Sequence, residues 1–135
     1  MSTQAIRIRP ADRQAMLDHV LAALPEEACG LLGGRDGAVR RVIPVANAAR
    51  SATRFRMQPE QQVRAMLALE AEGLEMTGIF HSHPEGPPGP SATDLAEAAY
   101  PQAAYLIWSP GPQGWACHAF RLEPDRARPI ALVVD

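Results

Sequence analysis

The stretch TGIFHSHPEGPPGPSATD, residues 77–94, decides how the fold is interpreted. Side chains of a strand point alternately to its two faces, so His81 and His83 share one face while Ser82 points to the other. In the following PEGPPGP, four of the seven residues are proline, which cannot continue a strand, and the chain turns towards Ser91. The stretch therefore predicts a strand, a reversal and the start of a helix.

The flanking segments alternate irregularly between strand and helix patterns, which predicts an α/β fold with a mixed sheet. One apolar stripe of the first helix, Met16, Leu17, Val20, Leu21 and Leu24, is expected on the core. The GGRDG turn, residues 33–37, supplies glycines for a hairpin. We expect one layered domain over residues 1–135, with strands at 5–9, 31–34, 38–47, 53–57, 74–83, 103–108, 114–122 and 130–134, and helices at 11–24, 59–72 and 91–100.

Composition limits the classes of function. The chain has 135 residues, 47% of them hydrophobic and 21% charged, with a net charge of −2, so nothing supports a nucleic-acid partner. We find no apolar core of a secretion signal and no run long enough to span a membrane, so we expect a cytoplasmic protein without a membrane partner. Cys29 and Cys117 form no Cys-x-x-Cys pattern and are expected to be buried structural thiols.

The same stretch contains groups that bind metals. Zinc takes nitrogen or carboxylate oxygen at about 2.0 to 2.2 Å, and a catalytic site uses three protein ligands and leaves the fourth position to water. Two imidazoles on one strand face supply two ligands, and Asp94, in the first turn of the next helix, could supply the third. Ser91-x-x-Asp94 is also a plausible capping box. The cap and the ligand role can coexist.

The motif HSHPEGPPGPSATD, residues 81–94, resembles the signature His-x-His-x(7)-Ser-x-x-Asp of the JAMM (MPN+) zinc metalloproteases, and the proline before the serine resembles the prokaryotic branch. The upstream PEEACGLLGG, residues 25–34, is similar to the family's Glu-x-Cys-Gly-Leu-Leu-x-Gly segment, and RFRMQPEQ, residues 54–61, is also similar to prokaryotic members. The resemblance implies the JAMM/MPN fold, a cytidine-deaminase-like domain with a curved mixed sheet flanked by helices.

The resemblance also implies roles for individual residues. Zinc would be held by His81, His83 and Asp94, Glu27 would be the general base, and Ser91 would donate a hydrogen bond to the oxyanion. Glu26 competes with Glu27 for the role of base, and composition does not choose between them. The family segment places the glutamate two residues before Cys29, which selects Glu27.

The implied activity is that of a zinc-dependent peptidase or isopeptidase. Its substrate would be the C-terminal tail of a ubiquitin-like or sulfur-carrier protein ending in Gly-Gly, with an amino acid or protein attached. Two alternatives stay open: a noncatalytic MPN-type scaffold for protein interactions, and a cell-wall or phage-associated peptidase. The sequence names neither the conjugate nor the oligomeric state.

Other polar residues are expected to be structural. His19 lies between apolar positions of the first helix and is expected at the boundary of the core. We expect His118 to be packed and hydrogen-bonded, and Glu85 to be a solvated charge beside the site. Gly30, Gly33 and Gly34 are expected to permit close packing, since no phosphate-binding pattern surrounds them.

Overall fold

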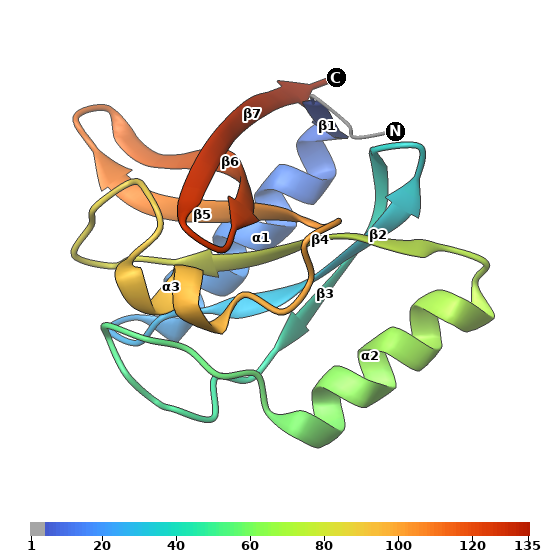
Figure 1. The fold of residues 1–135 in the computed structure, drawn as a ribbon, viewed down its shortest axis with the longest axis horizontal. Coiled ribbons are helices and arrows are strands. Elements are labelled where there is room, and N and C mark those ends of the chain that lie inside the picture. Colours follow the sequence, from blue (N-terminus) through green and yellow to red (C-terminus); the bar gives the residue numbers. More distant parts are fainter. Residues whose placement is uncertain (1–4) are drawn as a thin grey trace.

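The computed structural model describes residues 5–135, which form one sheet of seven strands with helices packed against it (Figure 1). The strand order is β1-β3-β2-β4-β5-β6-β7, and the parallel pairing of β1 with β7 closes the sheet into a barrel. Parallel and antiparallel pairs both occur, which confirms the mixed, curved sheet. The strands are β1 (Ala5–Ile8), β2 (Cys29–Arg35), β3 (Ala38–Val45), β4 (Glu75–Ser82), β5 (Ala104–Gly111), β6 (Gly114–Glu123) and β7 (Arg126–Val134).

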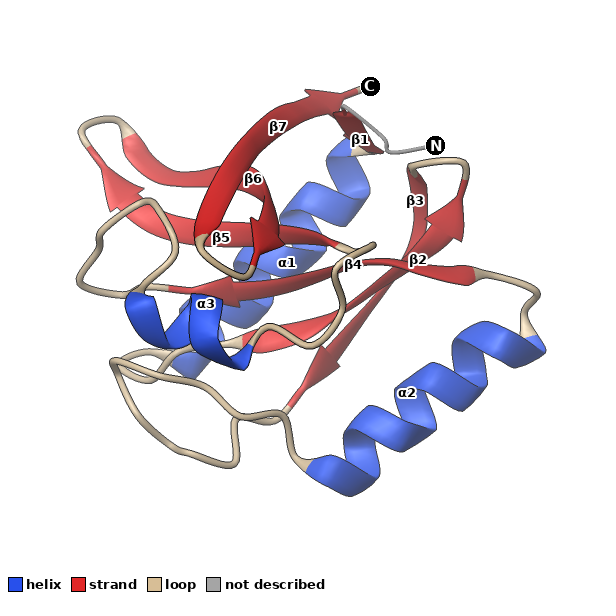
Figure 2. Cartoon of the chain, viewed as in Figure 1, coloured by secondary structure: helices blue, strands red, loops and turns tan. Residues whose placement is uncertain are grey.

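Within the described residues, three helices accompany the sheet: α1 (Pro10–Ala23), α2 (Pro59–Ala71) and the short α3 (Ala92–Glu97) (Figure 2). Because neighbouring residues of a strand face opposite sides, Leu31 and Leu32 of β2 enter two different cores. Leu32 lies in the core that includes Met16 of α1, and Leu31 lies in the core that includes Ala65 of α2. The helices α1 and α2 therefore cover opposite faces of the sheet.

Local sequence explains the hairpin between β2 and β3. Its two loop residues, Asp36 and Gly37, have positive φ angles of 53° and 76°, as the tight turn that matches strand twist requires. At Gly33, the side chain of Leu69 from α2 occupies the space that a Cβ would need. The close-packing role expected for this glycine is confirmed.

Three expectations about the elements are wrong in detail. Met16 and Val20 of α1 are buried, but Leu21 and Leu24, the residue that follows the helix, are each 43% exposed, so the buried stripe is narrower than predicted. Residues 53–57 form no strand and contribute a single bridge, Asn47 to Met57. The third helix ends at Glu97 rather than near residue 100, because Ala98 already adopts an extended conformation with φ −64° and ψ 122°.

Of the predictions for the other two histidines, one is wrong and one is confirmed. His118 is exposed on β6, so the packed, hydrogen-bonded role expected for it is wrong. His19 is half-buried, with Nε2 3.1 Å from the carbonyl oxygen of Cys29, which confirms the boundary position. Cys29 is buried and Cys117 half-buried, both are free, and burial raises the pKa of each thiol to about 12. Neither thiol is ionised near neutral pH.

Within residues 5–135, no helix is both long and apolar enough to cross a bilayer.

Candidate metal centre

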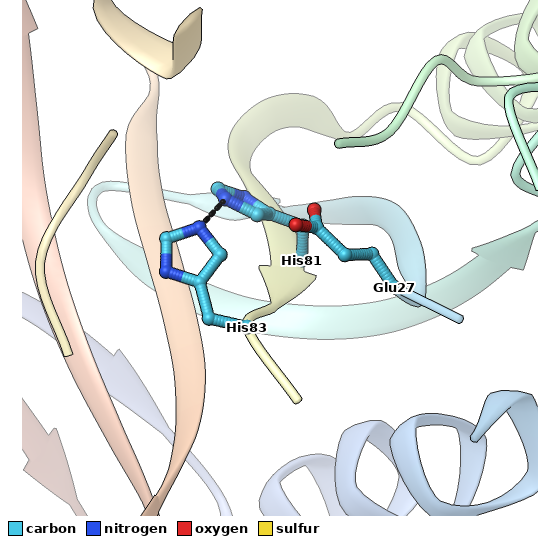
Figure 3. A group of neighbouring side chains, drawn as sticks. All are labelled: Glu27, His81 and His83. Carbon is cyan, nitrogen blue, oxygen red and sulfur yellow. Dashed lines mark hydrogen bonds between the residues drawn. The ribbon is translucent and has the colours of Figure 1, made fainter. Parts of the chain in front are cut away.

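The two histidines of the motif lie at the end of β4, a strand paired on both sides. His81 stands opposite Cys29 of β2 and Ile107 of β5. The backbone N–H of His83, one residue beyond the strand, donates to the carbonyl of Trp108 at 2.7 Å. Both imidazoles are buried, and their Nε2 atoms are 3.2 Å apart (Figure 3). The shared face that strand alternation predicts is confirmed.

The carboxylate of Asp94 reaches the same point from α3. Its Oδ2 lies 3.2 Å from Nε2 of His81 and 3.0 Å from Nε2 of His83. The helix begins with the predicted capping box, in which the backbone N–H of Asp94 donates to Oγ of Ser91 at 2.9 Å. The backbone N–H of Ser91 donates to Oδ2 of Asp94, also at 2.9 Å. The cap thus fixes the carboxylate in the position where it faces both imidazoles.

The spacing of these three atoms fits a small metal ion. A tetrahedral ion with bonds of about 2.0 to 2.2 Å separates its ligands by about 3.3 to 3.6 Å. The three observed separations run from 3.0 to 3.2 Å, just under that range. Nδ1 of His83 lies 2.8 Å from the carbonyl oxygen of Pro87, which can only accept, so Nδ1 donates. In the neutral ring, Nε2 then carries its lone pair towards the cluster, as metal ligation requires.

Burial and charge oppose one another in this cluster. Burial alone would raise the pKa of Asp94, but hydrogen bonds to His81 and His83 hold it well below its usual value. Burial lowers the pKa of His81, whereas for His83 the hydrogen bond and charge of Asp94 outweigh burial and raise the pKa. The carboxylate is therefore ionised at neutral pH and presents a negative charge to the two rings.

Glu27 lies beside the three groups, just before β2. The side chains of Glu27, His81 and His83 each offer a ligand atom, and these atoms all lie within 4.8 Å of one another (Figure 3). Glu27 is 2% exposed, and its Oε1 has no hydrogen-bond partner among the described residues. Burial raises its pKa to about 8, with His83 opposing and Asp94 adding to the shift. A buried carboxylate that is held close to the cluster but is otherwise unpaired suits proton transfer.

The competing glutamate is placed differently. Glu26 is half-buried, and its carboxylate faces Arg50 at 3.8 Å. It does not belong to the cluster of Glu27, His81 and His83. Glu85, in the loop after the histidines, is exposed as expected. Geometry therefore separates the two adjacent glutamates, a distinction that composition does not make.

Two neighbours of the cluster were not expected from the sequence. The ring of Phe55 stacks on His81, with centroids 4.4 Å apart and planes at 25°. The Oγ of Ser82 accepts a hydrogen bond of 2.8 Å from the backbone N–H of Ala28. Alternation along the strand shows that Ser82 faces away from the histidines, but nothing local in the sequence names its partner.

A cavity of about 290 Å³ opens beside His81 and Asp94. Its walls come from the loop before α2 and the start of that helix, from β4, β5 and β6, and from α3 with the segment after it. Most of the lining is apolar or aromatic, including Phe55, Ile79, Tyr100, Tyr105 and Leu122. The cluster is therefore reachable from an apolar groove, a common form of ligand site.

Two imidazoles and a carboxylate around one point, with a second, buried carboxylate beside them, match the protein groups of a mononuclear metallohydrolase. Comparison with known families agrees: residues 10–123 match the family described as prokaryotic homologs of the JAB domain. The chain belongs to this family.

Several curated proteins are similar to this chain. A desampylase of Haloferax volcanii is 36% identical over 117 residues, which is 82% of this chain and 84% of the relative. A probable TtuB-protein conjugate cleaving protease of Thermus thermophilus is 40% identical over 117 residues, covering 86% and 74%. A CysO-cysteine peptidase of Mycobacterium bovis is 38% identical over 97 residues, covering 70% and 66%.

Solved structures show the same architecture. A protein from Desulfitobacterium hafniense, determined in solution, has a TM-score of 0.87 and 39% identity, and the match covers 96% of this chain and 92% of that one. A JAB1/MPN domain protein from Archaeoglobus fulgidus has a TM-score of 0.61 over 98% of this chain and 100% of that one. Its 19% identity makes it evidence for the fold alone. The JAMM/MPN fold expected from the motif is confirmed.

Proposed function

We propose that this protein is a zinc-dependent peptidase or isopeptidase that hydrolyses the amide bond at the C-terminal tail of a ubiquitin-like or sulfur-carrier protein conjugate. The observation that carries the proposal is the meeting of His81, His83 and Asp94 around one point, beside Glu27, whose Oε1 has no hydrogen-bond partner among residues 5–135. The similar curated proteins support the substrate class: they are a desampylase, a probable TtuB-protein conjugate cleaving protease and a CysO-cysteine peptidase.

In this proposal His81, His83 and Asp94 hold the zinc ion. A bound zinc ion would act as a Lewis acid and lower the pKa of a bound water towards about 7. Glu27 is mostly protonated at neutral pH when its pKa is about 8, but a nearby cation favours the ionised carboxylate. Glu27 then accepts a proton from the attacking water and delivers it to the leaving amine, as a general acid-base catalyst.

Ser91 is the proposed donor to the oxyanion. Its Oγ accepts the backbone N–H of Asp94, which occupies a lone pair and leaves the hydroxyl proton available. The same residue can therefore cap α3 and donate a hydrogen bond to negative charge that develops on the scissile carbonyl.

The groove beside the cluster fits an extended tail. Phe55 and Tyr105 line a cavity that reaches His81 and Asp94, so a chain segment lying in it brings its end to the metal ligands. Glycines without side chains pass close to a buried centre with little steric cost. No observation on the described residues favours the scaffold or the cell-wall alternative over this one.

A cytoplasmic location is part of the proposal. Both cysteines are free, as is usual for proteins of a reducing compartment.

The test measures bound zinc and cleavage in the wild type, Glu27→Gln and His81→Ala. The two probes are a carrier protein ending in Gly-Gly and extended by one cysteine, and the same carrier joined to the ε-amine of a lysine peptide. Glu27→Gln should keep zinc and lose about 10²- to 10⁴-fold in rate, because a positioned base contributes about that factor. His81→Ala should lose both zinc and activity.

Matched controls come from the same residue types outside the cluster. Glu26→Gln removes the adjacent carboxylate, and His118→Ala removes an exposed imidazole on β6. Both should keep zinc and activity. Full activity in Glu27→Gln, or a wild type that binds no zinc, would refute the proposal.

A further inference from the structure

Glu27 lies between α1 and β2, outside the hydrogen-bonded ladder of the sheet. Its backbone N–H donates to the carbonyl of Ser51 at 2.8 Å, and its own carbonyl accepts from Nδ2 of Asn47 at 3.1 Å. Both partners belong to residues 46–58, the loop between β3 and α2, here called the β3–α2 loop. Oε1 of Glu27 has no partner among residues 5–135, so the hydrogen bonds described for this residue are those of its backbone.

The amide of Asn47 makes four hydrogen bonds, which is all that its donor hydrogens and acceptor lone pairs allow. Nδ2 donates to the carbonyls of Glu27 and Arg54, each at 3.1 Å. Oδ1 accepts from the backbone N–H groups of Ala49 and Arg56, each at 3.0 Å. Carbonyl oxygens can only accept, so this network fixes which end of the amide is the nitrogen. One side chain thus joins Glu27 to the first part of the β3–α2 loop, at Ala49, and to its last part, at Arg54 and Arg56.

The last part of the β3–α2 loop also contacts the metal cluster, through Phe55. Phe55 lies between Arg54 and Arg56, two of the residues whose backbone groups bind the Asn47 amide. Its ring stacks on His81 with centroids 4.4 Å apart. The Asn47 amide therefore holds the loop against Glu27 on one side, while the loop holds Phe55 against His81 on the other.

We propose that Asn47 is a positioning residue that fixes Glu27 relative to His81 through the β3–α2 loop. The inference rests on the proposed function, in which Glu27 is the base. Asn47 itself touches neither the metal cluster nor the reacting atoms. Its effect on the rate comes from the placement of the Glu27 backbone, and a displacement of about 1 Å in such a group can reduce a rate about 100-fold.

Asn47→Asp is the sharpest perturbation because it keeps the shape and the two acceptor contacts. It replaces both N–H donors by a carboxylate oxygen that faces the carbonyls of Glu27 and Arg54, so attraction becomes repulsion. Asn47→Ala removes all four bonds without adding a charge. Gln61→Ala is the matched control: Oε1 of Gln61 accepts from Ala46 of the same loop at 2.8 Å but does not contact Glu27.

The experiment uses the full-length, zinc-loaded protein and the carrier extended by cysteine as the probe. Both Asn47 variants should lower kcat by about 10- to 100-fold and change KM by a smaller factor, because the base is displaced while only one wall of the groove, the one that includes Phe55, belongs to the β3–α2 loop. Bound zinc should equal that of the wild type. Gln61→Ala should keep kcat within about twofold.

Amide hydrogen exchange gives a readout that does not depend on cleavage. Exchange at the Glu27 amide should rise about tenfold or more in Asn47→Asp and stay unchanged in Gln61→Ala, because the loop supplies the acceptor for that amide. If Asn47→Asp does not fold, Asn47→Ala decides by the same two measurements.

Unchanged exchange at Glu27, or a kcat loss accompanied by loss of zinc, would overturn the inference. So would equal kcat losses in Asn47→Ala and Gln61→Ala. A wild type that cleaves neither probe speaks against the proposed function instead, and the exchange measurement then still decides whether Asn47 positions Glu27.

Discussion

Ser82→Ala should destabilise the protein by about 2 kcal/mol, because it removes the acceptor of a backbone donor that water cannot reach. Oγ of Ser82 lies 2.8 Å from the backbone nitrogen of Ala28. Ser82 is 0% exposed and Ala28 is 1% exposed. Leaving such a buried donor unpaired costs about 1 to 3 kcal/mol, whereas a donor at the surface can bond to water instead.

This free energy converts into a melting temperature through the unfolding entropy. At about 2.1 cal/mol/K per residue, the 135 residues give about 0.28 kcal/mol/K, so Tm should fall by about 7 °C. Calorimetry of the metal-free protein in chelator is the appropriate measurement, because metal binding to the folded state would add stability of its own.

Ser51→Ala is the control for that measurement. Its hydroxyl also accepts a backbone N–H, that of Thr53 at 3.1 Å, but in an exposed part of the β3–α2 loop. Water can replace the lost acceptor there, so Tm should fall by less than about 2 °C. Equal decreases in the two variants would refute the reasoning, because burial would then make no difference.

Two further predictions concern the scaffold. The Asp12 carboxylate accepts Nε and Nη2 of Arg9, each at 2.8 Å; burial would raise its pKa, but these bonds lower it. The ionised Asp12 carboxylate therefore stabilises the folded protein above its unfolded pKa of about 3.9, and this contribution is lost as pH falls through its lower pKa in the folded protein. In urea titrations, Asp12→Asn should lower the free energy of unfolding by about 1 kcal/mol at pH 6 and by progressively less below about pH 4. A constant difference across that range would contradict the linkage. Gly33→Ala should cost about 1 to 3 kcal/mol in the same titration, because its Cβ would overlap the Leu69 side chain. Gly89→Ala, where a Cβ meets nothing within 4 Å, is the control, and equal stability of the two variants would show that α2 is not packed on Gly33.

Local sequence accounts for much of the candidate site. Strand alternation predicts that His81 and His83 share a face, and the Ser91-x-x-Asp94 pattern predicts the cap that orients the Asp94 carboxylate. Both depend on interactions between residues close together in the chain. Residue spacing alone does not select Glu27. Its distance from His81 follows from the pairing of β2 with β4, in which Cys29 stands opposite His81.

The parts that sequence does not predict depend on distant contacts. Closure of the sheet requires Ile6 of β1 to pair with Leu132 of β7, at opposite ends of the chain. The loop residues 53–57 show a strand pattern, but they have no neighbouring strand to pair with beyond one bridge. Leu21 belongs to an apolar stripe, yet it is 43% exposed because the buried contacts of α1 are concentrated around Met16 and Val20.

The groups of the site differ in how firmly the fold holds them. His81 lies in a strand that is paired on both sides, so moving it requires opening the sheet. Asp94 lies on a helix of six residues with none of them buried, held by the Ser91 cap and by contacts with the imidazoles. Segments with few buried contacts open at low free energy. A cation bound by His81, His83 and Asp94, as proposed, would therefore add most to the order of α3, and metal binding and the folding of that helix should be coupled.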